Sequence, residues 1–355
     1  MFVFECDAWH LRKVTGEVKL FSNFEAPLLV DSSFGDAVND VNSIPVSLDF
    51  SAGVSIYPDH SVHVDLLTLR AELALKSAKK NQRQFAIFEF DSEAGNGLNE
   101  LEFKGDFKRA LYEDQFSMYF QSKVRLSDSK VIGAEILTRW NHPEKGVLSP
   151  DTFLPMAEEM NLFRAFSRLL INKSFLMISR LKEFGNMHYA VNLSPYNLLE
   201  SDFTEFMKES LRQYGIRAES ITLEITETGM TLDRNLSHKV MDELAQIGFS
   251  LAVDDFGIGY TSLSYLQGLP LHEIKIDRSF ITGIDEKYNN SVIVKSLILL
   301  GQSLGMYITA EGVETEEEIE VLKNYGCNLV QGYYYSKPLP FDDFTEYLKK
   351  QNNRS

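Results

Sequence analysis

Short runs in which apolar and polar residues alternate recur along most of the chain beyond residue 107. In order, the runs read FSMYFQSKV, GAEILTRW, YAVNLS, ITLEITET, LAVDDFG, HEIKID, YITAEGV and LVQGYYY. Alternation with period two is typical of β-strands, and stretches with apolar residues at helical spacing separate the runs. Eight strands alternating with helices predict an α/β fold, a β/α barrel.

The stretches between the runs carry signals for where helices end. FTEFMKESLRQYG and NLSHKVMDELAQIG end in Gly215 and Gly248, which are predicted to be helix C-caps. The most apolar stretch, residues 291–310, contains Lys295, Gln302 and Ser303. It therefore predicts an amphipathic helix followed by a strand and no membrane segment.

One segment separates two regions that differ in their sequence pattern. SEAGNGLNE, residues 92–100, is small, polar and glycine-bearing, as is typical of linkers between domains. We therefore expect a smaller N-terminal domain over residues 1–95 and the barrel over residues 96–355.

The strand runs split into two columns, because successive side chains in a strand point to opposite faces. In ITLEITE, Leu223 lies in the apolar column and Glu224 in the polar one. Helices cover the outside of a β/α barrel, so the apolar column is expected to face the helices and the polar column the barrel axis. Over four runs the polar column includes Asn192, Glu224, Asp254 and Lys275.

Carboxylates from several strands are thus predicted to meet near the C-terminal ends of the strands, where β/α barrels hold their active sites. A single acidic residue in a strand would indicate a solvated edge or an ion pair, but the pattern repeats over many strands. Burying several carboxylates is costly unless cations or hydrogen bonds compensate. No His or Cys cluster accompanies them, and oxygen ligands favour Mg²⁺ or Mn²⁺ over zinc.

Composition narrows the class of ligand. The chain has 355 residues, 44% of them hydrophobic, which is enough for one large domain and a smaller one. A net charge of −16 argues against binding to a nucleic acid polymer, so a phosphate ligand would need bound cations. Cys6 and Cys327 form no close pair and no secretory signal is visible, which predicts a reducing, cytoplasmic location.

Seven segments resemble, in order, the signature segments of EAL domains across residues 107–350: GAEILTRW, AVNLSP, LEITET, DDFGIGYTSLSYL, IKIDRSF, AEGVE and QGYYYSKPL. The resemblance implies a modified TIM barrel and a phosphodiesterase that hydrolyses cyclic di-GMP to linear pGpG. The column pattern by itself indicates only a phosphate-type ligand on metal ions.

The same resemblance implies two divalent cations, Mg²⁺ or Mn²⁺, and inhibition by Ca²⁺. One cation would be held by Glu135, Asn192, Glu224 and Asp254. The other would be held by Asp255 and Glu311, with Asp254 as a bridge. Two such ions can clamp the scissile phosphate and lower the pKa of a water between them.

Further roles are implied residue by residue. The catalytic residues would be Lys275, Glu311, Glu135 and Asp255. Lys275 would hold or activate the attacking water, although its pattern alone fits an ion-pair partner of the neighbouring acids equally well. The substrate contacts would be Arg139, Gln121, Leu137 and Gln331. Gln331 would also support the second metal site, and the guanidinium of Arg139 suits a phosphate.

The resemblance implies that Glu227 supports the loop that begins at Asp255 and runs through Gly257 and Gly259.

The chain departs from the family pattern at three positions. Ile136 replaces the usual Ala, and alternation directs it to the helix layer, so we expect repacking rather than lost catalysis. Ile258 replaces a small residue in the loop thought to couple dimerisation to metal binding. Ser122 replaces the usual proline, which weakens the role given to Gln121.

The N-terminal region has its own resemblance. Residues 47–90, with SLDFSAGVSIYPDHS and LLTLRAELALKSAKKNQRQFAIFE, resemble the last part of an α+β GGDEF domain. Leu67, Ala71, Ala74 and Ala78 recur at helical spacing and predict a packing face. No Gly-Gly-Asp-Glu-Phe motif occurs in the chain, so we expect a degenerate or truncated domain without cyclase activity and with a structural or regulatory role.

Two other functions remain open at this point. A catalytically silent receptor for cyclic di-GMP would share the fold but would usually lack one of the ligands. A barrel hydrolase for another phosphoester would share the metal cluster but not the order of the segments. The resemblance further implies a homodimer formed through the EAL domain near the Asp255 loop.

Overall fold

The computed structural model describes residues 2–6, 38–41, 44–47, 51–61, 64–81, 83, 85–88, 93–160, 162–227, 229–257, 263–266, 268–286 and 288–352. The chain divides into two compact units, Met1–Lys108 and Arg109–Ser355.

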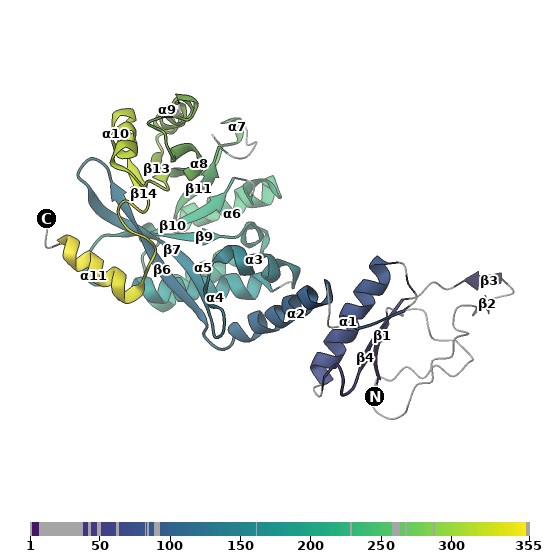
Figure 1. The fold of residues 1–355 in the computed structure, drawn as a ribbon. Helices are drawn as coiled ribbons and strands as arrows, with labels where there is room; N and C mark the ends of the chain where they lie inside the picture. Colours follow the sequence, from purple (N-terminus) through teal and green to yellow (C-terminus); the bar gives the residue numbers. More distant parts are fainter. Residues whose placement is uncertain are drawn as a thin grey trace. The chain divides into compact units, whose positions relative to one another are not determined.

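The larger unit is a closed barrel of eight strands (Figure 1). They are β6 (Phe116–Arg125), β7 (Lys130–His142), β9 (His188–Leu193), β10 (Ile221–Thr226), β11 (Ser250–Phe256), β12 (Glu273–Ile276), β13 (Tyr307–Glu311) and β14 (Leu329–Gln331). Each pairs with the next, and β14 pairs back onto β6. Two short strands, β8 (Gly146–Leu148) and β15 (Leu339–Pro340), extend β7 and β6. The eight predicted strands and the barrel are confirmed.

Strand β6 departs from the regular TIM pattern. It is antiparallel to both β7 and β14, whereas β7 and β9 to β14 run parallel. In the β6–β7 register, Phe116 pairs with Trp140 and Gln121 pairs with Glu135. The first residues of β6 therefore lie at the end of the barrel where the parallel strands finish.

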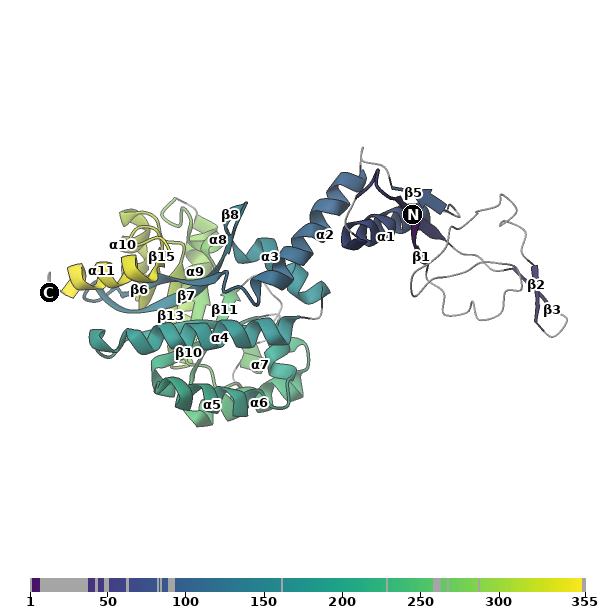
Figure 2. The ribbon, with the colours of Figure 1, turned by 90° about the horizontal axis from the view of Figure 1, so that it is seen from below.

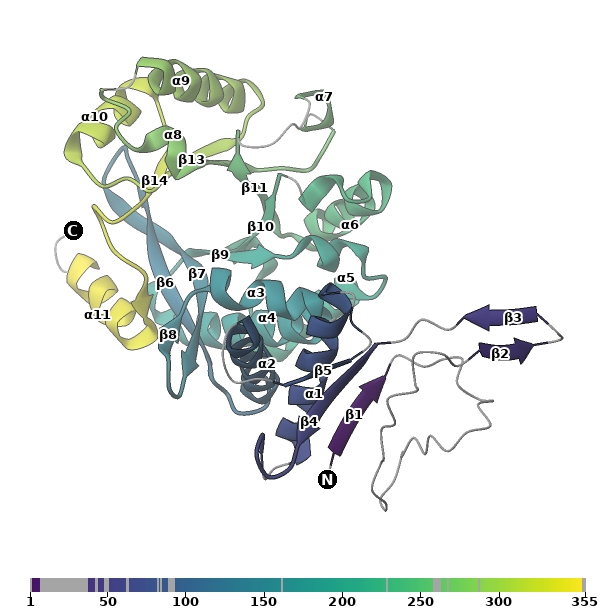
Figure 3. The ribbon, with the colours of Figure 1, turned by 45° about the vertical axis from the view of Figure 1, so that its right-hand side comes forward.

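Helices surround the strands (Figure 3). They are α3 (Pro150–Glu159), α4 (Phe163–Arg180), α5 (Phe203–Tyr214), α6 (Arg234–Ile247), α7 (Leu263–Leu266), α8 (Arg278–Ile281), α9 (Tyr288–Ser303), α10 (Glu316–Tyr325) and α11 (Phe341–Asn352). Helices α4, α5 and α6 lie side by side along one flank (Figure 2). Short 3-10 turns occur at Lys182–Phe184, Pro195–Leu199, Ala218–Ser220 and Gly229–Thr231.

The predicted helix ends are confirmed. Gly215 and Gly248 follow α5 and α6 with left-handed φ angles of 60° and 111°. Glycine adopts this conformation without the steric penalty of a Cβ, so it ends the helix here. The apolar stretch over residues 291–310 forms α9 and then enters β13, as predicted.

The apolar column of the strands packs against the helices. Leu223 of β10, Val253 of β11 and Ile274 of β12 are fully buried in one core with Met207 of α5 and Leu244 of α6. Burying such side chains contributes about 1.5–3 kcal/mol each. The polar column is left to face the barrel axis, which sets up the site described below.

The smaller unit contains a three-stranded sheet of β1 (Phe2–Cys6), β4 (Ala52–Ile56) and β5 (Phe85–Ile87), and a hairpin of β2 (Val38–Val41) and β3 (Ile44–Ser47). Helix α1 (Val64–Lys80) contacts β4. Its predicted packing face is buried, namely Leu67, Ala71, Ala74 and Ala78. The likeness to a GGDEF domain stays a prediction.

The segment expected to be a linker is helical. Helix α2 (Glu93–Ala110) runs through most of residues 92–100. Glycine and asparagine lower local helix propensity, but a helix continues across such residues once the following turns are formed. The division into domains 1–95 and 96–355 stays a prediction.

Among the described residues, no helix combines the length and the apolar character needed to cross a membrane.

Candidate metal-binding active site

Three carboxylates meet at the end of the barrel where the parallel strands finish. Asp254 and Asp255 lie near the end of β11, and Glu311 is the last residue of β13. One carboxylate oxygen of each lies within 4.8 Å of those of the other two. Oxygens at this spacing can share a cation.

A buried lysine lies among these acids. Lys275 of β12 is 1% exposed. Its Nζ lies 2.7 Å from Glu311 Oε1, 2.8 Å from Glu224 Oε2, 3.1 Å from Asp254 Oδ1 and 3.5 Å from Glu135 Oε2. Burial alone would lower the pKa of Lys275, but the four carboxylates outweigh it and hold this pKa well above its ordinary value.

Glu135 is held by amide donors from two other strands. Asn192 Nδ2 donates to its Oε1 at 2.7 Å, and Gln331 Nε2 donates to its Oε2 at 2.6 Å. Burial would raise the pKa of Glu135, but Lys275 and these two donors lower it below its ordinary value. The other amide atom, Gln331 Oε1, is buried and has no hydrogen-bond partner among the described residues, so it is a spare oxygen ligand.

Other carboxyl groups of the cluster hold their protons more tightly than usual. Burial raises the pKa of Glu311 to about 7, against the pull of Lys275. Burial also raises the pKa of Asp255, and the neighbouring Asp254 adds to the shift. The pKa of Glu224 is raised by burial as well, although Lys275 opposes it. The positive charge of Lys275 therefore does not outweigh burial and mutual repulsion for these three carboxyl groups.

A second buried lysine was missed in the sequence. Lys123 of β6 lies 2.7 Å from Glu273 Oε1 and 3.1 Å from Glu224 Oε1 through its Nζ. Thr309 Oγ1 donates to Glu273 Oε1 at 2.6 Å. Alternation placed Glu273 in the polar column of its strand, and Lys123 follows Gln121 at the same two-residue interval. The signal was present, but the partners come from strands far apart in the sequence.

The charge count tests whether cations fit. Lys123 and Lys275 face six carboxylates, those of Glu135, Glu224, Asp254, Asp255, Glu273 and Glu311. Six carboxylates against two ammonium groups leave four negative charges when all are ionised, which is the charge that two divalent cations neutralise. Together with the spare oxygen of Gln331, this donor set fits hard divalent cations.

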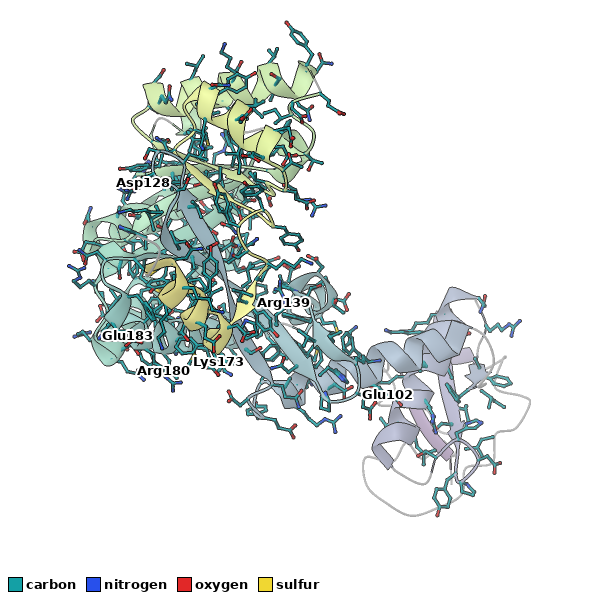
Figure 4. All side chains as sticks on the ribbon, turned by 60° about the vertical axis from the view of Figure 1, so that its left-hand side comes forward. Glu102, Asp128, Arg139, Lys173, Arg180 and Glu183 are labelled. Atoms are coloured by element: carbon teal, nitrogen blue, oxygen red, sulfur yellow. The ribbon has the colours of Figure 1, made fainter. Side chains whose placement is uncertain are left out.

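Two of the implied substrate residues lie further along β7 than Glu135. They lie toward the end of the barrel where the parallel strands finish, which we call the open end. Arg139, labelled in Figure 4, is half-buried and donates from Nη1 to the Thr138 carbonyl at 2.8 Å. Its guanidinium carbon lies 5.6 Å from the centre of the Tyr119 ring. Leu137 is half-buried and pairs with Tyr119 across β6 and β7.

Gln121 lies beside the carboxylate cluster with both ends of its amide engaged. Its Oε1 accepts from Gln331 Nε2 at 3.1 Å, and its Nε2 donates to the Ser336 carbonyl at 3.2 Å. The next residue explains the missing proline. The N–H of Ser122, which proline would lack, donates to Ser336 Oγ at 3.2 Å, and the two hydroxyl oxygens lie 2.8 Å apart.

Glu227 contacts the start of the Asp255 loop. Its Oε2 accepts from the Gly257 N–H at 3.2 Å, and its own N–H donates to the Asp254 carbonyl at 3.2 Å. These contacts are of the kind that a supporting role needs, and the role stays a prediction. Ile258 and Gly259 lie outside the described residues.

Comparisons with known proteins match most of the chain. Over 314 residues it is 33% identical to the cyclic di-GMP phosphodiesterase NbdA of Pseudomonas aeruginosa, covering 86% of this chain and 40% of that protein. Over 297 residues it is 32% identical to the bifunctional diguanylate cyclase/cyclic di-GMP phosphodiesterase MucR of the same organism, covering 83% and 43%. The chain thus spans about two fifths of the length of these curated relatives.

Solved structures show the same likeness. The PaMucR phosphodiesterase in complex with cyclic di-GMP has a TM-score of 0.66 and 32% identity, covering 68% of this chain and 99% of that one. The calcium and cyclic di-GMP complex of Klebsiella pneumoniae BlrP1 has a TM-score of 0.59 and 29% identity, covering 64% and 56%. The profile of the EAL domain matches residues 104–338, and the chain therefore belongs to the EAL domain family.

Proposed function

We propose that this protein is a metal-dependent phosphodiesterase that hydrolyses cyclic di-GMP to linear pGpG. The observation that carries the proposal is the excess of carboxylates at the open end of the barrel, where Asp254, Asp255 and Glu311 lie within reach of one cation. A dianionic substrate needs positive charge there, and the two buried lysines of the site, Lys123 and Lys275, are already paired with carboxylates. NbdA and MucR, its relatives, are named for action on cyclic di-GMP.

The proposed cofactors are two Mg²⁺ or Mn²⁺ ions. One would be held by Glu135, Asn192, Glu224 and Asp254, and the other by Asp255 and Glu311 with Asp254 shared. Bound divalent ions supply positive charge to a phosphate and acidify a water. The calcium in the BlrP1 complex supports a site for divalent cations, and inhibition by Ca²⁺ is part of the proposal.

The protein's own groups would then act on the phosphate and the water. Lys275 keeps its charge, because four carboxylates surround its ammonium group, so its N–H groups favour and orient a hydroxide. Arg139 offers guanidinium donors to a phosphate oxygen near the open end. Glu311 and Asp255, at the ends of β13 and β11, would hold the second cation next to the substrate phosphate. Leu137, Gln121 and Gln331 would contact the substrate.

Product analysis tests the proposal directly. The full chain is incubated with cyclic di-GMP and either Mg²⁺ or Mn²⁺, and pGpG is separated by chromatography. Glu135→Gln keeps the size of the side chain but removes its charge, so hydrolysis should fall by about 100-fold or more. The control is Glu183→Gln on the exposed outer surface (Figure 4), which should hydrolyse like the wild type.

Two other outcomes have clear meanings. Tight binding of cyclic di-GMP without pGpG at any concentration of either cation would contradict an enzyme and indicate a silent receptor. Faster cleavage of another diester would indicate a different substrate.

The proposal includes a homodimer formed through the barrel unit, near the Asp255 loop, and a cytoplasmic location. Exposed apolar residues on α9 support an interface on this unit, with Tyr288 80%, Val292 47% and Leu299 52% exposed. Analytical ultracentrifugation of the full chain checks it, and a monomer at micromolar concentration would count against it.

A further inference from the structure

Glu224 lies between two buried ammonium groups. Its Oε2 is 2.8 Å from Lys275 Nζ, and its Oε1 is 3.1 Å from Lys123 Nζ. The three side chains come from β10, β12 and β6, and none is more than 4% exposed. Each oxygen of this carboxylate therefore has its own cationic partner.

Lys123 is itself fixed from deeper in the barrel. Its Nζ lies 2.7 Å from Glu273 Oε1, which also accepts from Thr309 Oγ1 at 2.6 Å. Glu273 precedes Lys275 by two residues on β12, and Thr309 precedes Glu311 by two residues on β13. These strands run toward the open end, so Lys123, Glu273 and Thr309 form a layer one step below the carboxylate cluster. We call these three residues the lower layer.

The two lysines differ in what they share with the proposed cations. Lys275 contacts Glu135, Asp254 and Glu311 in addition to Glu224, so a bound cation competes with it for the same oxygens. The ion pairs of Lys123 are with Glu224 and Glu273, and Glu273 is not among the proposed ligands. The contact between Lys123 and Glu224 can therefore persist when a cation is bound.

We propose that Lys123 is a positioning residue for the metal site. Its ammonium holds Oε1 of Glu224 and leaves Oε2 directed toward the open end, ready to ligate a cation. Glu273 and Thr309 keep the ammonium in place. The inference rests on the proposed function, because it gives Glu224 the role of a metal ligand.

The test must separate positioning from simple loss of stability. Removing Lys123 alone leaves Glu273 buried without a counter-ion, which is strongly destabilising. The double variant Lys123→Met/Glu273→Gln removes both charges, keeps the side-chain volumes and leaves Thr309 an acceptor. Glu273→Gln alone leaves an amide oxygen that can still accept from Lys123, so it keeps the ammonium in place and retains the contact between Lys123 and Glu224. Lys173→Met is the control. Lys173 lies on the outer helix α4 and pairs with Asp114, away from the carboxylate cluster (Figure 4).

Mn²⁺ binding to the full-length variants is measured by electron paramagnetic resonance without nucleotide. The double variant should bind Mn²⁺ about tenfold or more weakly, whereas Glu273→Gln and Lys173→Met should bind like the wild type. Equal affinity in a folded double variant would overturn the proposal, as would a loss in Glu273→Gln as large as in the double variant.

A second comparison covers the case in which the double variant does not fold. Lys123→Gln is one atom too short to reach Glu224, and it should also weaken Mn²⁺ binding, whereas wild-type affinity would overturn the proposal. In hydrolysis assays kcat should fall while KM stays unchanged. Because Mn²⁺ binding is measured without cyclic di-GMP, a wild type that binds Mn²⁺ but releases no pGpG contradicts the proposed function and leaves the positioning result intact.

Discussion

The backbone N–H of Asp255 donates to the Oδ1 of the residue before it, Asp254, at 3.0 Å. Successive side chains in a regular strand point to opposite faces. Yet both Asp254 and Asp255 have a carboxylate oxygen within 4.8 Å of one of Glu311. The cause is local: Asp255 has a left-handed φ of 54°, and the register between β11 and β12 shifts between Val253 and Phe256. A bulge of this kind re-aims a side chain, and here it turns two successive acids toward one place.

Replacing Asp255 should separate stability from activity. Asp255→Gly relieves the left-handed backbone and the repulsion with Asp254, so the metal-free protein should be as stable as the wild type or more stable by about 1 kcal/mol. Hydrolysis should fall by about 100-fold or more, because a proposed metal ligand is lost. Urea unfolding in EDTA and the pGpG assay measure the two effects.

Ser129 provides the matched control for Asp255. It is exposed and has a similar φ of 56° outside the carboxylate cluster. Ser129→Gly should change stability to a similar small extent and leave hydrolysis unchanged. Unimpaired hydrolysis by Asp255→Gly would remove Asp255 from the site.

Cation affinity should depend on pH near neutrality. The pKa of Glu311 is raised to about 7 by burial, and a divalent cation binds the ionised carboxylate, so protons compete below that pH. Affinity for Mn²⁺ should therefore fall as the pH drops from 8 to 6, with about one proton released per ion bound at pH 6. Calorimetry in buffers of different ionisation enthalpy measures the proton release.

Glu311→Gln removes this titration and should flatten the pH dependence of what binding remains. Equal Mn²⁺ affinity of the wild type at pH 6 and pH 8 would contradict the raised pKa of Glu311.

The pairing of β7 with β9 should not tolerate a side chain at Gly133 of β7. A Cβ built there would lie 1.9 Å from the carbonyl oxygen of His188 on β9. Gly133→Ala must push two paired strands apart, so we expect a loss of about 3 kcal/mol or more in the free energy of unfolding. Gly105→Ala is the control: no atom lies within 4 Å of the added Cβ in helix α2, and stability should rise by about 0.5–1 kcal/mol. Chemical denaturation compares them, and a stable Gly133→Ala would show that the strands can separate.

Ile136 should matter for packing and not for chemistry. It is 4% exposed in the core with the helices, on the opposite face of β7 from Glu135. Ile136→Ala should lower the free energy of unfolding by about 2–5 kcal/mol, because it leaves a cavity. Hydrolysis per folded molecule should be unchanged. A thermal melt measures the stability, and the pGpG assay below the melting temperature measures hydrolysis. A large fall in kcat would show that the packing of Ile136 affects the geometry of the site.

Much of the barrel follows from local patterns in the sequence. Alternation alone identified all eight strands, since the apolar column must face the helices, and Ile136 lies where alternation directed it. Gly215 and Gly248 end their helices because few other residues adopt their φ angles. Asn192, Glu224, Asp254 and Lys275 meet in space because strand direction brings the ends of parallel strands together.

What the sequence did not predict depends on contacts between distant segments. The reversed direction of β6 is set by its pairing with both β7 and β14, and no local pattern encodes it. The lower layer was missed for the same reason: alternation gives the face of Lys123 but not its depth or its partner. The small, polar and glycine-bearing residues 92–100 predict a boundary between domains and no helix, whereas the neighbouring turns carry α2 through them.

The direction of β6 also decides where the preceding chain joins the barrel. Phe116 pairs with Trp140, beyond the part of β7 that pairs with β9, so the polypeptide enters at the end where the parallel strands finish and then passes inward to Gln121, opposite Glu135, and to Lys123. The backbone upstream of Phe116 therefore leads directly into the strand that carries Gln121 and Lys123.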